Sequence, residues 1–413
     1  MQRRKKNEYI GYIRTKPLLV MLALGSTALY FGLPLIFSTS YTALPAAVAT
    51  TAIEPQTVPL VMHLPTPKPQ KAIYMSSCVA GTPSFREELV KLVEETEINS
   101  IIIDIKDFSG TLSYVPKGEA LKRYISQRSR SPDMEECIKT LHDKGIYVIG
   151  RITVFQDPFL AKERPDLAVK KASDGSTWKD FKGISYMDPG AKEVWDHIVA
   201  IAKDSYSIGF DELNFDYIRF PSDGPMSDIA FTWSGNRPKP EVLEGFFAYL
   251  SGELHPLGII LSADIFGMTT TNTDDLNIGQ VLERVSPYFD YIAPMVYPSH
   301  YPPKFNGWDN PNKHVYEVIK YSMDAAVRRY LATSTVIALR GVAPLASTTP
   351  PLYPKEEWPT EKLRPWLQDF DYGGNYDIPE VKAQITAVYD AGLTSWMLWA
   401  PSNRYTKGAL LPE

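Results

Sequence analysis

Short apolar runs recur along the chain from about residue 71 onward, and β-branched and aromatic residues are frequent in them. Runs of this length and composition, bounded by turn residues, predict buried β-strands. Eight strands are therefore expected, at residues 72–76, 100–104, 146–152, 210–215, 259–264, 291–296, 363–369 and 395–399.

Between these runs lie longer segments with the period of an amphipathic helix. Helices are expected at residues 84–97, 132–144, 191–205, 241–254, 276–285, 315–331 and 381–391. Strand and helix alternate up to an eighth strand, which is typical of a parallel (β/α)8 barrel, the TIM barrel. A doubly wound open sheet would alternate in the same way, but no Gly-rich phosphate-binding loop follows the first expected strand.

The lengths of the connections also favour a barrel. Connections from a helix to the next strand are short, and several end in a glycine that suits a helix C-terminus, such as Gly145 and Gly392. Connections from a strand to the next helix are long, and residues 332–362, which precede the seventh strand, are the exception to this trend. Loops that follow the strands of a barrel gather at one face, where active sites lie.

The first 70 residues follow another pattern. Residues 1–16 are basic, and residues 17–37 form an uncharged apolar run. At about 1.5 Å per residue this run spans about 30 Å, the thickness of a bilayer core. It is longer than the apolar region of about 7–15 residues in a cleaved signal peptide. We therefore expect a single-pass signal-anchor in the cell membrane, with a cytoplasmic N-terminus and an exported remainder.

Cleavage in the Ala-rich stretch at residues 43–49 is the alternative, and it would give a secreted protein. Residues 38–70 are rich in Pro, Thr and Ala and lack periodicity, so they are expected to form an extended linker. Residues 71–413 then form a single barrel domain.

Composition narrows the classes of partner and cofactor. The net charge of −5 argues against nucleic acid as the main partner. The 24 Tyr residues suit stacking on sugar rings, although such residues also serve protein cores. Cys78 and Cys137 allow one disulfide but no metal cluster, and we expect two buried free thiols. No zinc-ligand spacing or Walker loop is present, so no metal or other cofactor is expected.

Carboxylates stand at the ends of four expected strands, at Asp104, Asp107, Asp216, Asp264 and Asp369. A carboxylate is costly to bury unpaired, but at the C-terminal end of a strand it can face the open mouth of a barrel. Neighbouring carboxylates raise one another's pKa, so one can donate a proton while another stays ionised. Cleavage of a glycosidic bond requires such a pair. Alternatively, these acids cap loops or pair with Arg151 and Arg219.

Asp216 is the foremost candidate in this set. Side chains alternate along a strand, so Asn214 and Asp216 share one face while Phe215 lies on the other. Asp264 ends the next strand, about 4.8 Å away, which would allow the close spacing of a retaining pair. The register between the strands decides this, so the stereochemical outcome stays open. Asp211 and Glu212, near the beginning of the strand, are expected to be structural.

Aromatic and basic residues accompany the acids. Tyr297 and His300 follow the sixth expected strand, and Trp399 ends the last one. Aromatic rings at a barrel mouth can stack on sugars, whereas His300 is expected to serve as a hydrogen-bonding loop residue. Arg151 ends the third strand and is expected to neutralise Asp104 and Asp216, with binding of a substrate carboxylate or phosphate as the alternative. All of these residues, with Asn214 and Arg219, are candidates for contact with a substrate.

Several longer segments resemble the bacterial family DUF4015, described as a putative glycosyl hydrolase domain. They are the stretches GTPS at 81–84, IDIKD at 103–107, GRI at 150–152, NFDYIRFP at 214–221, SADIFG at 262–267, PMVYP at 294–298 and WAPSN at 399–403. The resemblance extends from about residue 73 to 410. It implies a TIM barrel in which Asp216 is the nucleophile or base and Asp264 the acid or second carboxylate, with Asp104 and Asp369 as alternatives for the second role.

The expected activity is that of a cell-surface glycoside hydrolase that acts on a cell-wall or extracellular polysaccharide. A non-catalytic carbohydrate-binding or scaffold protein at the wall is the alternative. A barrel mouth that binds another protein is a third hypothesis.

Overall fold

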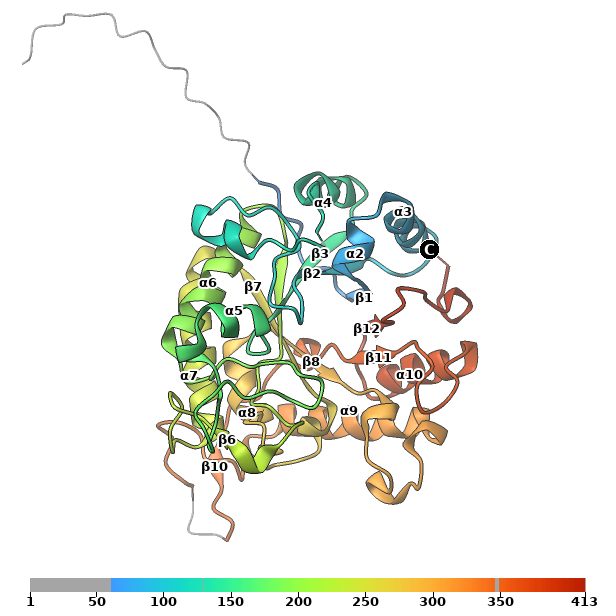
Figure 1. Cartoon of the computed structure of the whole chain (residues 1–413). Coiled ribbons are helices and arrows are strands. Elements are labelled where there is room, and N and C mark those ends of the chain that lie inside the picture. Colours follow the sequence, from blue (N-terminus) through green and yellow to red (C-terminus); the bar gives the residue numbers. More distant parts are fainter. Residues whose placement is uncertain (1–60, 129, 346–348, 413) are drawn as a thin grey trace, which may run out of the picture. The chain divides into compact units, whose positions relative to one another are not determined.

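The computed structural model describes residues 61–128, 130–345 and 349–412. Its strands form a closed parallel barrel in the order of the sequence (Figure 1), with Lys71 of the first strand paired to Trp396 of the last. The barrel strands are β1 (Lys71–Met75), β2 (Ser100–Lys106), β3 (Tyr147–Thr153), β5 (Glu212–Asp216), β7 (Ile260–Phe266), β8 (Tyr291–Met295), β11 (Trp366–Gln368) and β12 (Trp396–Trp399). The expectation of a (β/α)8 barrel is therefore confirmed.

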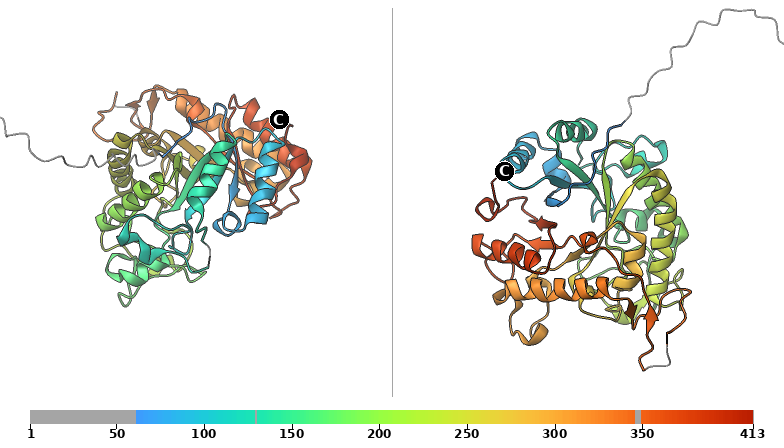
Figure 2. Two further views of the ribbon diagram at one scale, coloured as in Figure 1. Left: turned by 90° about the horizontal axis from the view of Figure 1, so that it is seen from above. Right: turned by 180° about the vertical axis from the view of Figure 1, so that it is seen from behind.

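Helices surround the barrel on its outer side, as Figures 1 and 2 show. They are α2 (Ser77–Ala80), α3 (Pro83–Glu94), α4 (Met134–Asp143), α5 (Pro158–Glu163), α6 (Lys192–Tyr206), α7 (Lys239–Leu254), α8 (Leu282–Val285), α9 (Val315–Leu331) and α10 (Ile378–Asp390). Proline occupies the first turn of α3, α5 and α10, where its missing N–H group costs nothing. Asp377 and Glu380 form a capping box at the start of α10.

Two small antiparallel sheets lie in the connecting loops. One pairs β4 (Lys170–Lys171) with β6 (Ile229–Ala230), and it joins the loops that follow β3 and β5. The other pairs β9 (Ser334–Thr335) with β10 (Tyr353–Pro354), within the long connection before β11.

Alternate side chains of each strand point into the barrel, as the geometry of a closed sheet requires. Ala72, Ile102, Ile149, Ala293 and Met397 form part of a buried cluster that fills the interior. Phe215, one residue before Asp216, belongs instead to the larger cluster between the strands and the helices. The predicted alternation on this strand therefore holds, and it directs Asn214 and Asp216 inward.

Buried charges at the N-terminal end of the barrel are paired. Glu212 forms an ion pair with Arg364 at 2.9 Å and accepts a hydrogen bond from the Tyr147 hydroxyl at 3.2 Å. Asp211 accepts the Val148 amide at 2.8 Å and lies 2.9 Å from Nε2 of His142. Both acids thus fix the base of the barrel, the role expected for residues at the beginning of a strand.

Residues 61–70, assigned above to the linker, lie against this base. The Leu64 amide donates to Asp211 at 2.6 Å, the Thr66 hydroxyl lies 3.0 Å from that of Tyr147, and the Gln70 amide donates to Ser395. The compact unit accordingly begins at Val61. Because buried Asp211 and Tyr147 have polar atoms that need partners, this segment is held in place although it has no helical or strand periodicity.

Two expectations were wrong in detail. The helix expected at 276–285 is reduced to α8, because Leu276, Asn277 and Gly279 adopt left-handed φ angles of 51°, 57° and 85° that cannot continue a right-handed helix. The cysteines are both free, as expected, and Cys137 is buried, but Cys78 is exposed on α2, close to the barrel mouth.

The basic segment 1–16, the expected anchor at 17–37 and the linker up to residue 60 lie outside the described residues. Within the described part of the chain, no helix is both long enough and apolar enough to cross a membrane.

Candidate functional site

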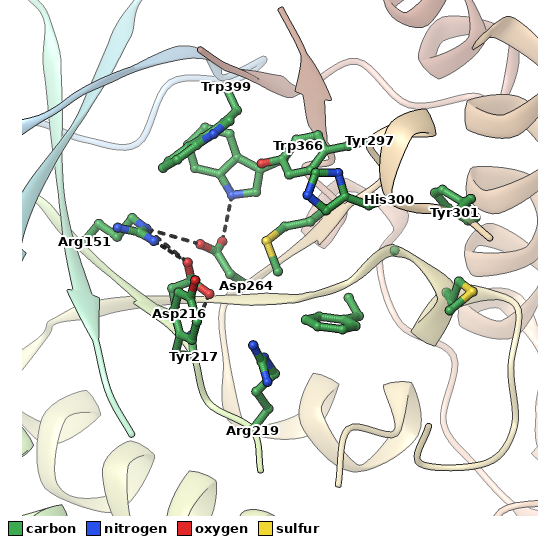
Figure 3. A pocket seen from close by; sticks show the side chains of 14 residues that line it. Arg151, Asp216, Tyr217, Arg219, Asp264, Tyr297, His300, Tyr301, Trp366 and Trp399 are labelled. Carbon is green, nitrogen blue, oxygen red and sulfur yellow. Dashed lines mark hydrogen bonds and ion pairs between the residues drawn. The ribbon is translucent and has the colours of Figure 1, made fainter. Parts of the chain in front are cut away.

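A cavity of about 320 Å³ opens at the C-terminal ends of the barrel strands (Figure 3). Two of its acids come from neighbouring strands, since Asp216 is the last residue of β5 and Asp264 lies near the end of β7. Its wall includes Arg151, Tyr217, Arg219, Phe266, Met295, Tyr297, His300, Trp366 and Trp399. The cavity therefore lies at the face of the barrel where active sites are found.

Arg151 on β3 is the central charge of the site, and it is buried. Its Nη1 donates to Oδ1 of Asp104 at 2.6 Å, and its Nη2 donates to Oδ2 of Asp216 at 2.5 Å. Its Nε lies 3.9 Å from Oδ2 of Asp264. The Tyr74 hydroxyl donates to the remaining oxygen of Asp104 at 2.5 Å. One guanidinium thus contacts three carboxyl groups. The cluster of four side chains therefore carries an excess of negative charge unless a carboxyl group retains its proton.

Asp264 is the carboxyl group that retains a proton. Its Oδ1 accepts hydrogen bonds from the Asn214 amide at 2.9 Å and from the Trp366 indole at 2.8 Å. Burial, and after it the negative charge of Asp216, raises the pKa of Asp264 to about 8. The pKa of Asp104 is also raised by burial, against the opposing charge of Arg151. At neutral pH the site therefore contains a protonated Asp264 beside Asp216, which is paired with a guanidinium.

The two carboxyl groups are close to each other. The register of β5 and β7 aligns Phe215 with Ala263, so Asp216 and Asp264 follow at equivalent positions. Oδ2 of Asp216 and Oδ2 of Asp264 lie 3.2 and 3.9 Å from the same Arg151 nitrogen. The two oxygens are consequently at most about 7 Å apart, a limit that includes both the retaining and the inverting spacing.

The chain turns sharply after Asp216. Tyr217 adopts a φ of 53°, a left-handed conformation that is uncommon for a residue with a side chain. Its amide donates to Oδ1 of Asp216 at 2.5 Å, and its ring lines the cavity. Backbone strain of this kind gathers at functional sites, where the surrounding structure enforces it.

Aromatic rings form another part of the wall of the first cavity. The Trp399 ring stacks on Tyr74 with centroids 4.1 Å apart and meets Trp366 edge to face at 5.6 Å. The Arg151 guanidinium lies 5.2 Å from the Trp399 ring. Tyr297 and His300 contact each other at 5.3 Å between ring centroids. Such rings offer flat apolar faces with polar edges beside the carboxyl groups.

A second cavity of about 550 Å³ adjoins the first and shares Arg151, Tyr217, Arg219 and Trp399 with it. Asp104 and Asp107 face this second cavity, together with exposed Phe108. The barrel mouth is therefore an extended, aromatic-lined depression with carboxyl groups along its floor.

The structure brings most of the residues singled out from the sequence to this mouth. The first cavity is lined by Asp216, Asp264, Arg151, Arg219, Tyr297, His300 and Trp399. The second cavity is lined by Asp104 and Asp107, and Asn214 donates a hydrogen bond to Asp264. Asp369 lines neither cavity. Its buried carboxylate accepts the amide of Thr406 at 2.9 Å and the hydroxyl of the same residue at 2.6 Å, so it anchors the C-terminal loop.

Several residues of the site were not anticipated, among them Tyr74, Tyr217 and Trp366. Alternation along β1 would have placed Tyr74 inside the barrel, since Ala72 also points inward. Alternation gave no such indication for Trp366. It is the first residue of β11, and only its long side chain brings the indole N–H to Asp264.

The described residues contain no group of three or more His, Cys, Asp or Glu side chains placed to hold a metal ion. At the mouth, Arg151 occupies the centre of the acidic cluster.

A family model described as a putative glycosyl hydrolase domain matches residues 72–405. No curated protein matches the chain in sequence.

Solved structures resemble the chain to different extents. A hypothetical protein from Ruminiclostridium thermocellum is 34% identical over 46% of this chain and 96% of its own, with a TM-score of 0.42. The PgaB (BpsB) glycoside hydrolase domain from Bordetella bronchiseptica is 13% identical over 83% of this chain and 99% of its own, with a TM-score of 0.55. An alpha-L-fucosidase from Paenibacillus thiaminolyticus is 11% identical over 83% of this chain and 46% of its own, with a TM-score of 0.52. The last two likenesses support the barrel fold.

Proposed function

We propose that this chain, which belongs to the DUF4015 family of putative glycosyl hydrolase domains, hydrolyses glycosidic bonds of a polysaccharide through Asp216 and Asp264. One observation carries the proposal. Two adjacent carboxyl groups in one cavity have different surroundings, a guanidinium at Asp216 and neutral hydrogen-bond donors at Asp264. Burial and the neighbouring charge keep Asp264 protonated at neutral pH, because they raise its pKa to about 8.

In the proposed reaction, Asp264 donates its proton to the glycosidic oxygen as the bond to the anomeric carbon breaks. The Asp216 carboxylate either attacks that carbon or removes a proton from the water molecule that attacks it. The sugar ring develops positive charge in the transition state, which the carboxylates around Arg151 stabilise. In the first route water then hydrolyses the bond between the sugar and Asp216, and Asp264 regains its proton from that water molecule. In the second route the water proton goes to Asp216, and the pair is reset when Asp216 releases this proton to solvent and Asp264 takes one up.

The aromatic wall supplies the binding surface in this proposal. Trp399 is positioned by Tyr74 and Arg151, and its ring stands beside the carboxyl groups. A sugar ring stacked there would bring its glycosidic bond close to Asp264. The proposed substrate is a cell-wall or extracellular polysaccharide. We further propose that the barrel is tethered outside the cytoplasm, on the basis of the basic segment and apolar run at residues 1–37.

The test is the Asp216→Asn variant, assayed for release of reducing sugar from purified wall and extracellular polysaccharides. Loss of the carboxylate should lower the rate at least about 100-fold, because the nucleophile or base is removed while the side chain keeps its size. Unchanged circular dichroism and thermal midpoint would show that the fold survives. Asp143→Asn, an exposed carboxylate on α4 that pairs with Lys139, is the matched control and should keep full activity.

Full activity of Asp216→Asn would refute the assigned role. Should the unaltered protein retain glycans without releasing sugar, and should Trp399→Ala abolish that retention, the aromatic wall would instead serve a non-catalytic carbohydrate-binding protein.

A further inference from the structure

Arg219 differs from the other buried arginines of the barrel. Arg151 pairs with Asp104 and Asp216, and Arg364 pairs with Glu212. Arg219 is only 8% exposed, yet among the described residues no carboxylate lies within 4.0 Å of its guanidinium. A buried cation that forms no direct ion pair is costly, so its retention at this position calls for an explanation.

The contacts of Arg219 hold its side chain without neutralising it. Its Nη1 donates to the Phe220 carbonyl at 3.1 Å and to the Ser222 hydroxyl at 3.2 Å. Its guanidinium lies 5.1 Å from the Tyr217 ring and 4.8 Å from the Phe266 ring. Figure 3 shows the guanidinium pointing into the first cavity from below Tyr217, and the residue lines both cavities. The charge is therefore fixed in direction and open to a ligand.

One other cationic residue, Lys182, lines the second cavity. It is exposed and forms no ion pair within the described part of the chain. The pKa of His300, which lines the first cavity, is lowered mainly by burial and secondarily by the positive charge of Lys182. By contrast, Asp180, which also lines the second cavity, already accepts the Lys182 and Ile184 amides. Arg219 and Lys182 thus offer positive charge to a ligand here, beside the acidic residues Asp107 and Asp223, which also line the second cavity.

We propose that Arg219 recognises an anionic substituent of the substrate sugar, a carboxylate or a phosphate, and so selects acidic glycans. This inference rests on the proposed function and names the substrate class of the same site. A planar guanidinium matches the paired oxygens of both anions. Arg219 is also one of the four residues that line both the cavity of Asp216 and Asp264 and the second cavity, so it would hold a sugar next to the cleaved bond.

The experiment measures binding and hydrolysis with the full chain, purified in detergent. The probes are oligosaccharides of polygalacturonate, alginate and hyaluronan, each beside the same oligosaccharide after chemical reduction of its carboxylates. Inorganic phosphate serves as a competitor. At least one acidic probe should bind more tightly than its reduced counterpart. Arg219→Gln should weaken that binding about tenfold to a hundredfold, the effect of a lost hydrogen bond to a charged group, and leave the affinity for the reduced probe unchanged.

Two further variants separate recognition from structure. Arg219→Lys keeps the charge and should restore part of the preference for the acidic probe. Arg237→Gln is the matched control, because Arg237 also donates to backbone carbonyls, those of Ser234 and Trp233, but lines neither of the two cavities. It should behave as the unaltered protein does. Equal weakening of acidic and reduced probes by Arg219→Gln would mean that Arg219 only holds its turn, and the proposal would fail.

The outcomes distinguish this inference from the proposed function. Cleavage of neutral glycans with no preference for acidic ones would overturn the inference and keep the hydrolase. Arg219-dependent binding of an acidic probe with no cleavage would support anion recognition and overturn the hydrolase. Displacement of the reduced probes by inorganic phosphate, without affinity for the acidic probes, would assign the site to phosphate-bearing glycans. No binding of the acidic probes and no competition by phosphate would overturn the inference.

Discussion

Asp216 and Asp264 occupy equivalent positions on neighbouring strands, yet their hydrogen-bond donors differ in charge. Asp216 faces the Arg151 guanidinium, whereas Asp264 meets the neutral donors of Asn214 and Trp366. Burial disfavours a second negative charge, so the proton settles on the group with the neutral partners. The proposed division into acid and base would therefore arise from the residues around the pair rather than from the two aspartates themselves.

This arrangement predicts a pH dependence of stability. The pKa of Asp264 is raised from 3.8 to about 8, so between these values the folded protein keeps a proton that the unfolded chain releases. The free energy of unfolding should then fall as pH rises through this window, by at most about 1.4 kcal/mol per pH unit from this group. Asp264→Asn cannot titrate and should lose this component, which makes it more stable than the unaltered protein at pH 8.

Urea denaturation between pH 4.5 and 8.5 measures the effect. The Asp143→Asn control should reproduce the slope of the unaltered protein, because that carboxylate is exposed. Parallel curves for Asp264→Asn and the unaltered protein would show that Asp264 does not hold a proton in the folded state.

Among the elements, the segment between β7 and β8 departs furthest from its sequence pattern. Apolar residues at helical spacing predicted a helix, but Leu276, Asn277 and Gly279 take left-handed conformations. This path brings Gln280 back to the end of β7, where its side chain accepts the Phe266 amide at 2.9 Å. Phe266 in turn borders Arg219. The irregular segment thus supports one wall of the first cavity.

Gly279 should be intolerant of a side chain. Its φ is 85°, and an added Cβ would lie 2.7 Å from Cδ1 of Leu243 on α7. Gly279→Ala should lower the free energy of unfolding by about 1–2 kcal/mol from the left-handed backbone alone, with a further cost from the contact. Gly252→Ala, at an exposed position inside α7 with open space around it, should instead raise it by about 0.5–1 kcal/mol. Chemical denaturation of the two variants compares them, and equal effects would contradict this account.

The barrel and the facing pair at Asp216 and Asp264 were predictable because they depend on local rules. Alternation along a strand and the common edge of parallel strands are properties of the backbone. The placement of Trp366, Asp369 and residues 61–70 depends instead on which distant atoms need partners. Asp369 accepts a hydrogen bond from Thr406, and Leu64 donates one to Asp211. Neither contact follows from a periodic pattern in the sequence.

At the scale of the whole molecule, the two ends of the barrel differ in how their buried charges are paired. At the N-terminal end Glu212 and Arg364 neutralise each other, and Asp211 has His142 and backbone donors as partners. At the C-terminal end one arginine, Arg151, serves three carboxyl groups. Buried charges are therefore paired at the first end and incompletely compensated around Arg151 at the second.

The proposed tether gives a prediction for the whole chain. In a bacterial host the protein should sediment with membranes and resist extraction with alkaline carbonate, because an apolar run of about 20 residues spans a bilayer. Protease added outside intact spheroplasts should digest the barrel. The membrane-bound form should have the mass of the uncleaved chain. A shorter, soluble product would indicate cleavage near residues 43–49, and a protected barrel would contradict export.

The position of two indole rings has a practical consequence. Of the eight tryptophans in the chain, Trp366 and Trp399 line the first cavity, and Trp399 lies against both Tyr74 and Arg151. Indole fluorescence responds to the polarity of its surroundings, so an occupant of the cavity would alter the emission of these rings. A change in tryptophan fluorescence would therefore report the binding of unlabelled glycans, whether or not a bond is cleaved.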